Sequence, residues 1–287
     1  MFVAQQLVAV LGRGVVDPDE PLLHADDLGA TRGDGVFDAA LVVRDENGCT
    51  VHHLEAHLAR FADSAALLSL PAPDLAAWRE LIGEATRAWD VPGEATLKLL
   101  WSRGRENSPA EPSGYLTITA VDPAAQVRSR AGISVITCAR GHASDAFADA
   151  PWLLGGVKSL SYAVNMAARR FAQAQGADDA LFVSSDGFLL EGPTAGLIVA
   201  LDDELVTTPL GATGILPSVT VQVILDAAEA AGVGVRHELV RPEQLRSAQG
   251  AWLCSSIKGV LPIVAVDGTP LRHDPAITRT LAASAGF

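Results

Sequence analysis

Lys158 is one of three lysines in a chain of 287 residues, and its surroundings differ from those of the other two. It follows Gly155 and Gly156, which let a backbone segment or a ligand approach closely. Lys98 lies in an alternating stretch and is expected to point to solvent, whereas Lys258 is expected in a loop. A lysine amine reacts when it is desolvated or lies near another cation. The simpler alternative is a helix-start lysine that reaches water.

Four other residues could support an amine that forms a Schiff base with a carbonyl cofactor such as pyridoxal phosphate. Glu191 ends an apolar strand and could keep a ring nitrogen protonated. Tyr162 lies four residues after Lys158, on the same face if a helix spans both. The expected helix from Ser218 has free N–H groups at its start, and Arg60 could join them in binding a phosphate. The alternatives are an exposed carboxylate, a serine that only caps its helix and a solvated arginine.

The order of expected elements predicts an α+β protein, because strands and helices alternate without a repeated βαβ pattern. In the first part we expect strands at 8–12, 35–43, 95–104 and 114–122, a hairpin turn at 46–48, and helices at 55–70 and 75–89. In the second part we expect strands at 132–138, 197–201, 204–209, 233–240 and 250–256, a hairpin at 178–192 turning at 185–187, and helices at 155–176 and 218–231.

This pattern divides the chain into two expected domains. Residues 1–122 would form a small N-terminal α/β domain, and residues 123–130, which are polar and lack periodicity, would form a linker. Residues 131–287 would form a larger C-terminal domain that carries both Lys158 and Glu191.

Composition excludes several classes of function. The net charge of −13, from 34 acidic and 21 basic residues, argues against nucleic-acid binding. Cys49, Cys138 and Cys254 are scattered, so we expect neither a disulfide framework nor a metal site, and a reducing cytoplasm fits. No stretch reaches the roughly 18 apolar residues of a membrane span, and the first residues lack the basic region of a signal peptide. We therefore expect a cytoplasmic enzyme that acts on small molecules.

Seven segments, in order, carry a resemblance to a known family: RGDGVF, HLARFADSA, LKLLWSRG, VKSLSYAVN, FLLEGPTAGLIV, GILPSVT and CSSIKGVLPI. Together they resemble the fold-type IV pyridoxal-phosphate enzymes of the class IV aminotransferase family. That family includes branched-chain and D-amino-acid aminotransferases and 4-amino-4-deoxychorismate lyases. The resemblance is strongest to lyase-like members from actinobacteria, through HADDLGATRGDGVF. It implies a two-domain α+β fold like that of D-amino-acid aminotransferase, and commonly a homodimer with partner residues near the site.

The resemblance also implies roles for particular residues. Lys158 would be the Schiff-base lysine, Glu191 would pair with the pyridine nitrogen, and Tyr162 would bind the phenolic oxygen of the cofactor. Phe37 would line the substrate side, and Ile257 would lie at the carboxylate end of the pocket. The phosphate would be bound by Arg60, the backbone of Val219 and Thr220, and the hydroxyls of Thr220 and Ser256.

The chain departs from the family pattern at several positions. Segment 191–196 lacks the usual Ser-Asn pair, segment 218–221 lacks the usual arginine, and Asp38 replaces the more usual glutamate or threonine. Arg32, Arg103 and Arg105 are additional cations, which could bind carboxylates of an anionic substrate or could simply lie on the surface.

The resemblance implies a lyase that releases pyruvate from 4-amino-4-deoxychorismate and leaves 4-aminobenzoate, a folate precursor. The alternative is transamination of D-amino acids or branched-chain amino acids by the same residues. A protein that binds the cofactor without turnover is the non-enzymatic alternative. In the first two cases the partner would be a small amine or amino acid with a carboxylate.

Overall fold

The computed structural model describes residues 5–108 and 111–287, so the first four residues used in the signal-peptide argument lie outside it. The chain forms two compact units. The first comprises Met1–Pro123 with Val157–Tyr162, and the second comprises Ala124–Gly156 with Ala163–Phe287. This division differs from the expected domains, because the segment carrying Lys158 belongs to the first unit. The expected linker at 123–130 is helical and not irregular, since Pro123–Ala131 form helix α4, and the boundary between the units falls at its start.

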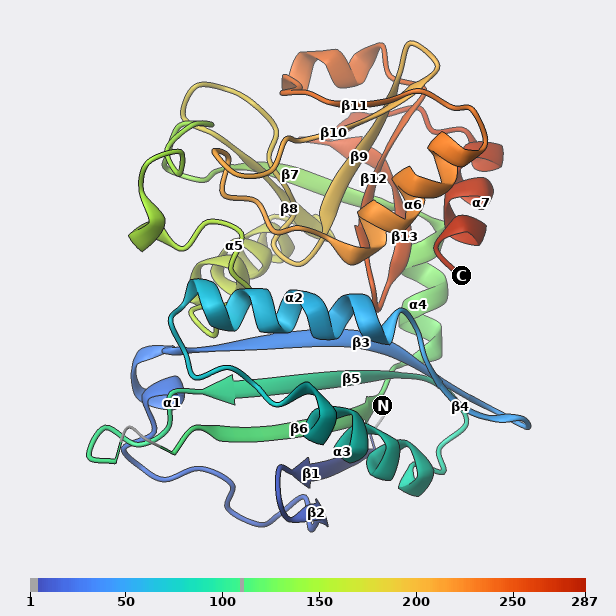
Figure 1. Ribbon diagram of the computed structural model, residues 1–287. Helices are drawn as coiled ribbons and strands as arrows, with labels where there is room; N and C mark the ends of the chain where they lie inside the picture. The colour runs from blue at the N-terminus through green and yellow to red at the C-terminus, as the bar shows by residue number, and fades with distance from the viewer. Residues whose placement is uncertain (1–4, 109–110) are drawn as a thin grey trace. The chain divides into compact units, whose positions relative to one another are not determined.

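The first unit is built on a six-stranded antiparallel sheet in the order β2-β1-β6-β5-β3-β4 (Figure 1). Its strands are β1 (Gln6–Val10), β2 (Gly14–Val16), β3 (Gly35–Asp45), β4 (Gly48–Val51), β5 (Gly93–Ser102) and β6 (Ser113–Ala120). Its helices are α1 (Leu28–Arg32), α2 (Leu54–Leu67) and α3 (Leu75–Ala88). The predicted turn at 46–48 is confirmed, because Asp45 pairs with Gly48.

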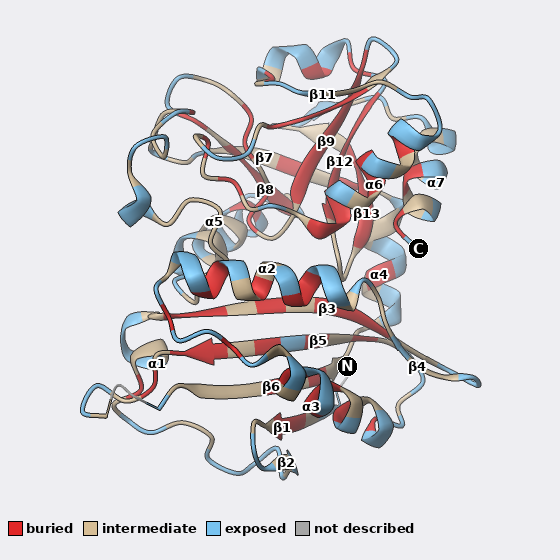
Figure 2. Cartoon of the chain, in the orientation of Figure 1, coloured by how far each residue is buried: buried red, intermediate tan, exposed pale blue. Residues whose placement is uncertain are grey.

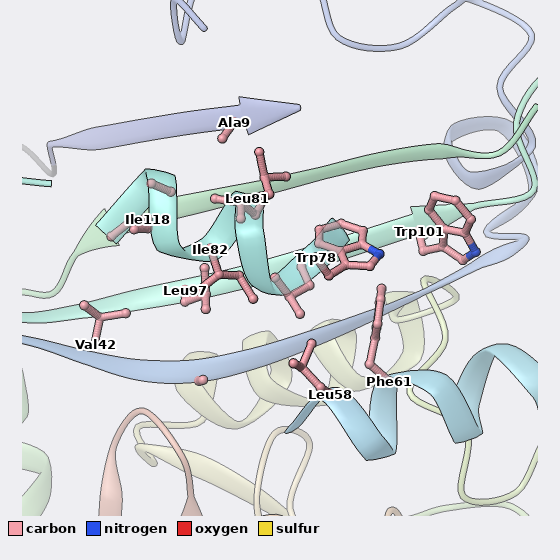
Figure 3. Packing of buried hydrophobic residues seen from close by; sticks show 14 of the residues in the cluster. Ala9, Val42, Leu58, Phe61, Trp78, Leu81, Ile82, Leu97, Trp101 and Ile118 are labelled. Carbon is pink, nitrogen blue, oxygen red and sulfur yellow. The ribbon is translucent and has the colours of Figure 1, made fainter. Parts of the chain in front are cut away.

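Helices α2 and α3 bury their apolar stripes against one face of this sheet (Figure 3). Leu58 and Phe61 of α2 meet Trp78 of α3, and the rings of Phe61 and Trp78 pack edge to face with centroids 5.3 Å apart. The opposite sides of both helices are exposed (Figure 2). Both helices are therefore amphipathic, with the apolar side of each facing the sheet.

The second unit contains an eight-stranded mixed sheet in the order β11-β10-β9-β12-β13-β7-β8, with β14 paired to β13. Its strands are β7 (Ile133–Ala139), β8 (Asp179–Val183), β9 (Gly196–Leu201), β10 (Glu204–Thr207), β11 (Val235–His237), β12 (Gly250–Ser255), β13 (Gly259–Val266) and β14 (Thr269–Pro270). Besides α4, its helices are α5 (Ala163–Ala174), α6 (Val219–Ala230), α7 (Pro275–Ser284) and the 3-10 turns η1 (Pro151–Leu153) and η2 (Pro242–Arg246).

Helices α6 and α7 share a buried cluster with β9, β12 and β13, in which Trp252 is fully buried. Both sheets carry packed helices, so the α+β class is confirmed. Among the residues that the structure describes, no helix has the length and apolar character needed to cross a membrane.

The helix expected at 155–176 begins later, at Ala163. Lys158 and Tyr162 both precede α5, so their expected placement on one helical face is wrong. The physical reason is a competing set of backbone hydrogen bonds, because the Leu160 N–H donates to the Gly35 carbonyl across 2.8 Å. Gly156 turns the chain into this segment with a positive φ of 76°.

Replacing Trp78 with alanine should destabilise the first unit by about 3–5 kcal/mol, because a fully buried indole leaves a cavity between α2, α3 and the sheet. Thermal unfolding followed by circular dichroism would measure the shift. The matched control is Leu67→Ala, since Leu67 on α2 of the same unit is 60% exposed and its loss should cost within about 0.5 kcal/mol. Equal losses for the two variants would contradict the proposed packing role of Trp78.

Candidate functional site

Lys158 lies in an extended segment that is bound to β3 and to α2. Its carbonyl accepts a 3.0 Å hydrogen bond from the Phe37 N–H, and its own N–H donates to the Ser64 hydroxyl across 3.2 Å. Gly35 makes the close approach possible, because a Cβ there would lie 2.6 Å from a methyl carbon of Leu160. The backbone of Lys158 is therefore held on both sides, which limits where its side chain can reach.

The Lys158 amine lies against two aromatic rings. Its Nζ is 4.5 Å from the ring centroid of Phe37 and 5.7 Å from that of Tyr162. The two rings meet edge to face with centroids 5.2 Å apart. Ring faces attract an ammonium group and also exclude water from around it. The structure thus brings together three of the predicted site residues, although Tyr162 arrives through the extended segment and not through a helix.

Arg60 lies on α2 and is bound to Asp38 of β3. Its Nε donates to Asp38 Oδ2 across 2.9 Å and its Nη2 donates to Oδ1 across 2.8 Å. The imidazole Nδ1 of His57 lies 2.7 Å from the same Oδ1. Asp38 and His57 are almost fully buried, and the Arg60 side chain is 11% exposed. Sequence reasoning noted Asp38 only as a departure and missed His57, although His57 and Arg60 are three residues apart on one helix face.

The charge state of this cluster follows from its contacts. Burial by itself would raise the pKa of Asp38, but Arg60 and His57 outweigh burial and hold that pKa well below its usual range. The pKa of His57 is lowered, chiefly by burial, although Asp38 acts to raise it. At neutral pH we therefore expect an ionised Asp38 and a neutral His57.

In the second unit, the start of α6 forms an anion-binding arrangement. Ser218 caps the helix by accepting a hydrogen bond from the Val221 N–H. Among the residues described, the N–H groups of Val219 and Thr220 have no hydrogen-bond acceptor, as expected for the first turn of a helix. The Thr220 hydroxyl lies 3.1 Å from the Ser256 hydroxyl, just beyond the end of β12. Two amides and two hydroxyls are thus gathered where a helix favours negative charge.

Glu191 also lies in the second unit, where the predicted hairpin at 178–192 returns along β8. The Phe182 N–H donates to the Glu191 carbonyl across 2.9 Å, and Gly187 makes the turn with a φ of 90°. The Glu191 carboxylate accepts a 3.2 Å hydrogen bond from the Leu216 N–H. Arg140 and His142 line, with Glu191, a small cavity of about 20 Å³. That volume is enough for about one water molecule.

The structure gives the predicted substrate arginines other partners. Arg103 binds both oxygens of Asp34 and also donates to the carbonyls of Leu68 and Ser69. This set of bonds indicates a structural role for Arg103 and does not support the expectation that it binds substrate.

The two other arginines on this surface also pair with acids. Arg32 is 64% exposed and pairs with Glu106, while Arg105 pairs with Asp26. Exposed pairs of this kind contribute little to stability and can be exchanged for other partners. A substrate role for Arg32 therefore stays a prediction. The carbonyl of Ile257 accepts a 2.7 Å hydrogen bond from Gln126, so the backbone at this predicted substrate residue is anchored to α4.

Comparison with known proteins yields several long matches. A protein of Mycobacterium tuberculosis named bifunctional aminodeoxychorismate lyase / D-amino acid transaminase is 40% identical over 277 residues, which cover 94% of each chain. A D-alanine aminotransferase of Bacillus licheniformis is 27% identical over 88% of this chain and 86% of its own length.

Solved structures agree with these sequence matches. A hypothetical aminotransferase from Mycobacterium tuberculosis in its PLP-bound form has a TM-score of 0.91 and 39% identity, covering 98% of both chains. A fold IV transaminase from Curtobacterium pusillum has a TM-score of 0.89 and 37% identity, covering 99% of this chain and 100% of its own. The amino-transferase class IV family model matches residues 35–266. The chain therefore belongs to the class IV aminotransferase family, as the sequence motifs predicted.

Proposed function

We propose that this chain is a pyridoxal-phosphate-dependent lyase that converts 4-amino-4-deoxychorismate into 4-aminobenzoate and pyruvate. The observation that carries the pyridoxal-phosphate chemistry is the position of the Lys158 amine, held against Phe37 and Tyr162 by a fixed backbone. The 40% identical relative named as both a lyase and a D-amino acid transaminase supports the choice. Transamination of D-amino acids or branched-chain amino acids is the alternative, supported by relatives with those names.

The residues present fit pyridoxal phosphate. The amides of Val219 and Thr220 and the hydroxyls of Thr220 and Ser256 suit the acceptor oxygens of a phosphate, and Arg60 would add charge. The carboxylate of Glu191 would hold a proton on the pyridine nitrogen. Once bound, the cofactor supplies a ring that accepts the electron pair left when a proton leaves the substrate carbon.

Lys158 would act in two ways. Lys158 would hold the cofactor covalently, and its amine, once free, would accept a proton. That proton comes from the substrate carbon that bears nitrogen. In the lyase reaction the neighbouring C–O bond would then break, the leaving enolpyruvate would take up a proton on carbon to become pyruvate, and the substrate ring would become aromatic. Phe37 and Tyr162 would limit the movement of the amine and keep water away from it.

Two further features stay predictions. A homodimer would cover apolar side chains that are exposed on the second unit, including Trp152, Leu153, Val164 and Phe171. A binding protein without turnover would bind the cofactor at the same residues but would show no product.

Replacing Lys158 with alanine should lower turnover at least about 100-fold, because both the covalent attachment and the proton transfer are lost. Borohydride reduction followed by peptide mass analysis should find the cofactor on Lys158 in the wild type and on no lysine in the variant. The matched control is Lys98→Ala, since Lys98 is exposed on β5. Cofactor attached to Lys98 or Lys258, or full activity in the Lys158 variant, would contradict the assignment.

The product distinguishes the lyase from the transaminase. Incubation with 4-amino-4-deoxychorismate should give 4-aminobenzoate and pyruvate in equal amounts, measured by chromatography. A second incubation with D-alanine or leucine and 2-oxoglutarate measures amino transfer. Absence of the aromatic product together with rapid amino transfer would replace the lyase proposal with the transaminase. Cofactor binding without product in either assay would indicate a binding protein.

Replacing Glu191 with glutamine should lower kcat by about 100-fold or more, because a neutral amide stabilises a protonated pyridine nitrogen poorly. The variant should still bind the cofactor, since Lys158 is intact, and absorbance titration would verify this. Glu243→Gln is the control because Glu243 is an exposed carboxylate of the same unit. Unchanged kcat in the Glu191 variant would remove this residue from the proposed reaction.

A further inference from the structure

A buried carboxylate fixes the orientation of the Arg60 guanidinium. Asp38 is 1% exposed and binds Arg60 through both of its oxygens, at 2.9 Å and 2.8 Å. Both side chains lie beside the apolar cluster that Leu58 and Phe61 of α2 form with β3. A buried ion pair contributes little net stability, because the cost of removing both charges from water offsets their attraction. Stability alone therefore does not explain why this pair is present.

His57 provides a second support for this pair. Its Nδ1 lies 2.7 Å from an ionised carboxylate, so this nitrogen must carry the proton and donate it. A lone pair there would face the lone pairs of Asp38 Oδ1. The 3.3 Å contact between Arg60 Nη2 and His57 Nδ1 is therefore a contact between two donors that share one acceptor. Nε2 of His57 then carries the lone pair, and it is buried without a partner among the described residues.

The geometry of the guanidinium sets where its other N–H groups point. The bidentate contact uses the edge formed by Nε and Nη2, so the N–H bonds of Nη1 point away from Asp38. A planar guanidinium held at one edge cannot rotate without breaking both bonds. Arg60 thus presents its other edge in one fixed direction.

We infer that Asp38 and His57 are positioning residues that orient Arg60 toward the phosphate of the cofactor. The inference rests on the proposed function, in which Arg60 binds that phosphate. It adds two residues that touch neither cofactor nor substrate and act only through the guanidinium. It also gives a role to a carboxylate that lies in an otherwise apolar face of the sheet.

The direction in which phosphate affinity changes when Asp38 is neutralised distinguishes a positioning role from a purely electrostatic effect. Removing the negative charge of Asp38 would by itself increase the attraction of Arg60 for an anion and tighten phosphate binding. Losing the bidentate contact instead lets the guanidinium rotate and removes two charge-assisted hydrogen bonds that orient it. The positioning role therefore predicts weaker binding, in the opposite direction to the charge effect.

Asp38→Asn tests the inference. Apoprotein is titrated with pyridoxal 5′-phosphate and, separately, with pyridoxal, which lacks the phosphate, and both titrations are followed by absorbance. We expect the affinity for pyridoxal 5′-phosphate to fall about 10-fold or more, and the affinity for pyridoxal to stay within about threefold of the wild type. Glu55→Gln is the matched control, because Glu55 also binds an arginine of the first unit, Arg79, through both oxygens but at an exposed position.

The other possible results of these titrations would contradict the positioning role of Asp38. Unchanged or tighter binding of pyridoxal 5′-phosphate would overturn the positioning role, and so would an equal loss for both ligands, which would indicate a general structural effect. If Asp38→Asn fails to fold, His57→Leu is used, and the same selective loss for the phosphorylated ligand is required. Wild-type protein that binds neither ligand would instead refute the proposed function itself.

Discussion

The extended backbone pairing between the Lys158 segment and β3 is the constraint on which the first unit's part of the site depends. The Phe37 N–H donates to the Lys158 carbonyl, and the Leu160 N–H donates to the Gly35 carbonyl. The segment is thus paired with the strand in an antiparallel direction. This pairing places the amine against the ring of the same Phe37. A helix starting at Gly155 would have used these backbone groups internally and would have turned the amine elsewhere.

Strand β3 serves two purposes because successive side chains of a strand point to opposite faces. Phe37 lies against Lys158 on one face, while Asp38 lies on the buried face and binds Arg60. Val36 and Ala40, on the same face as Asp38, pack in the apolar cluster with α2. A shift of one residue in this strand would therefore exchange the two faces and lose both contacts.

The second unit builds its part of the site by a different means. A helix start and a strand end supply amides and hydroxyls, and a hairpin supplies Glu191 with a backbone donor. Gly196 on β9 permits the close approach of α6, because a Cβ there would lie 2.7 Å from Val221. Each group is thus placed by backbone geometry, and the two hydroxyl side chains that could bind the phosphate, those of Thr220 and Ser256, are short. Short side chains lose less conformational entropy when they bind a ligand than long ones do.

The sequence predicted the helices at 55–70 and 75–89, the two hairpins and the family, and it singled out Lys158 and Tyr162 before their contacts were known, whereas Phe37 was implied by the family resemblance. Residue scarcity, turn residues and helical periodicity were enough for the first of these, because they are local properties of the chain. It did not predict where α5 begins, because the backbone bonds that hold Lys158 come from residues more than a hundred positions away.

The sequence also did not predict the ion-pair partners of the arginines. Arg103 and Arg60 are both guanidinium groups bound by an aspartate distant in sequence, Asp34 in one case and Asp38 in the other. Residue type alone determined that each could bind an anion. Only the tertiary structure decided which carboxylate each one binds and which edge of the guanidinium that contact occupies, because ion pairs form between groups that folding, and not the order of the chain, brings together.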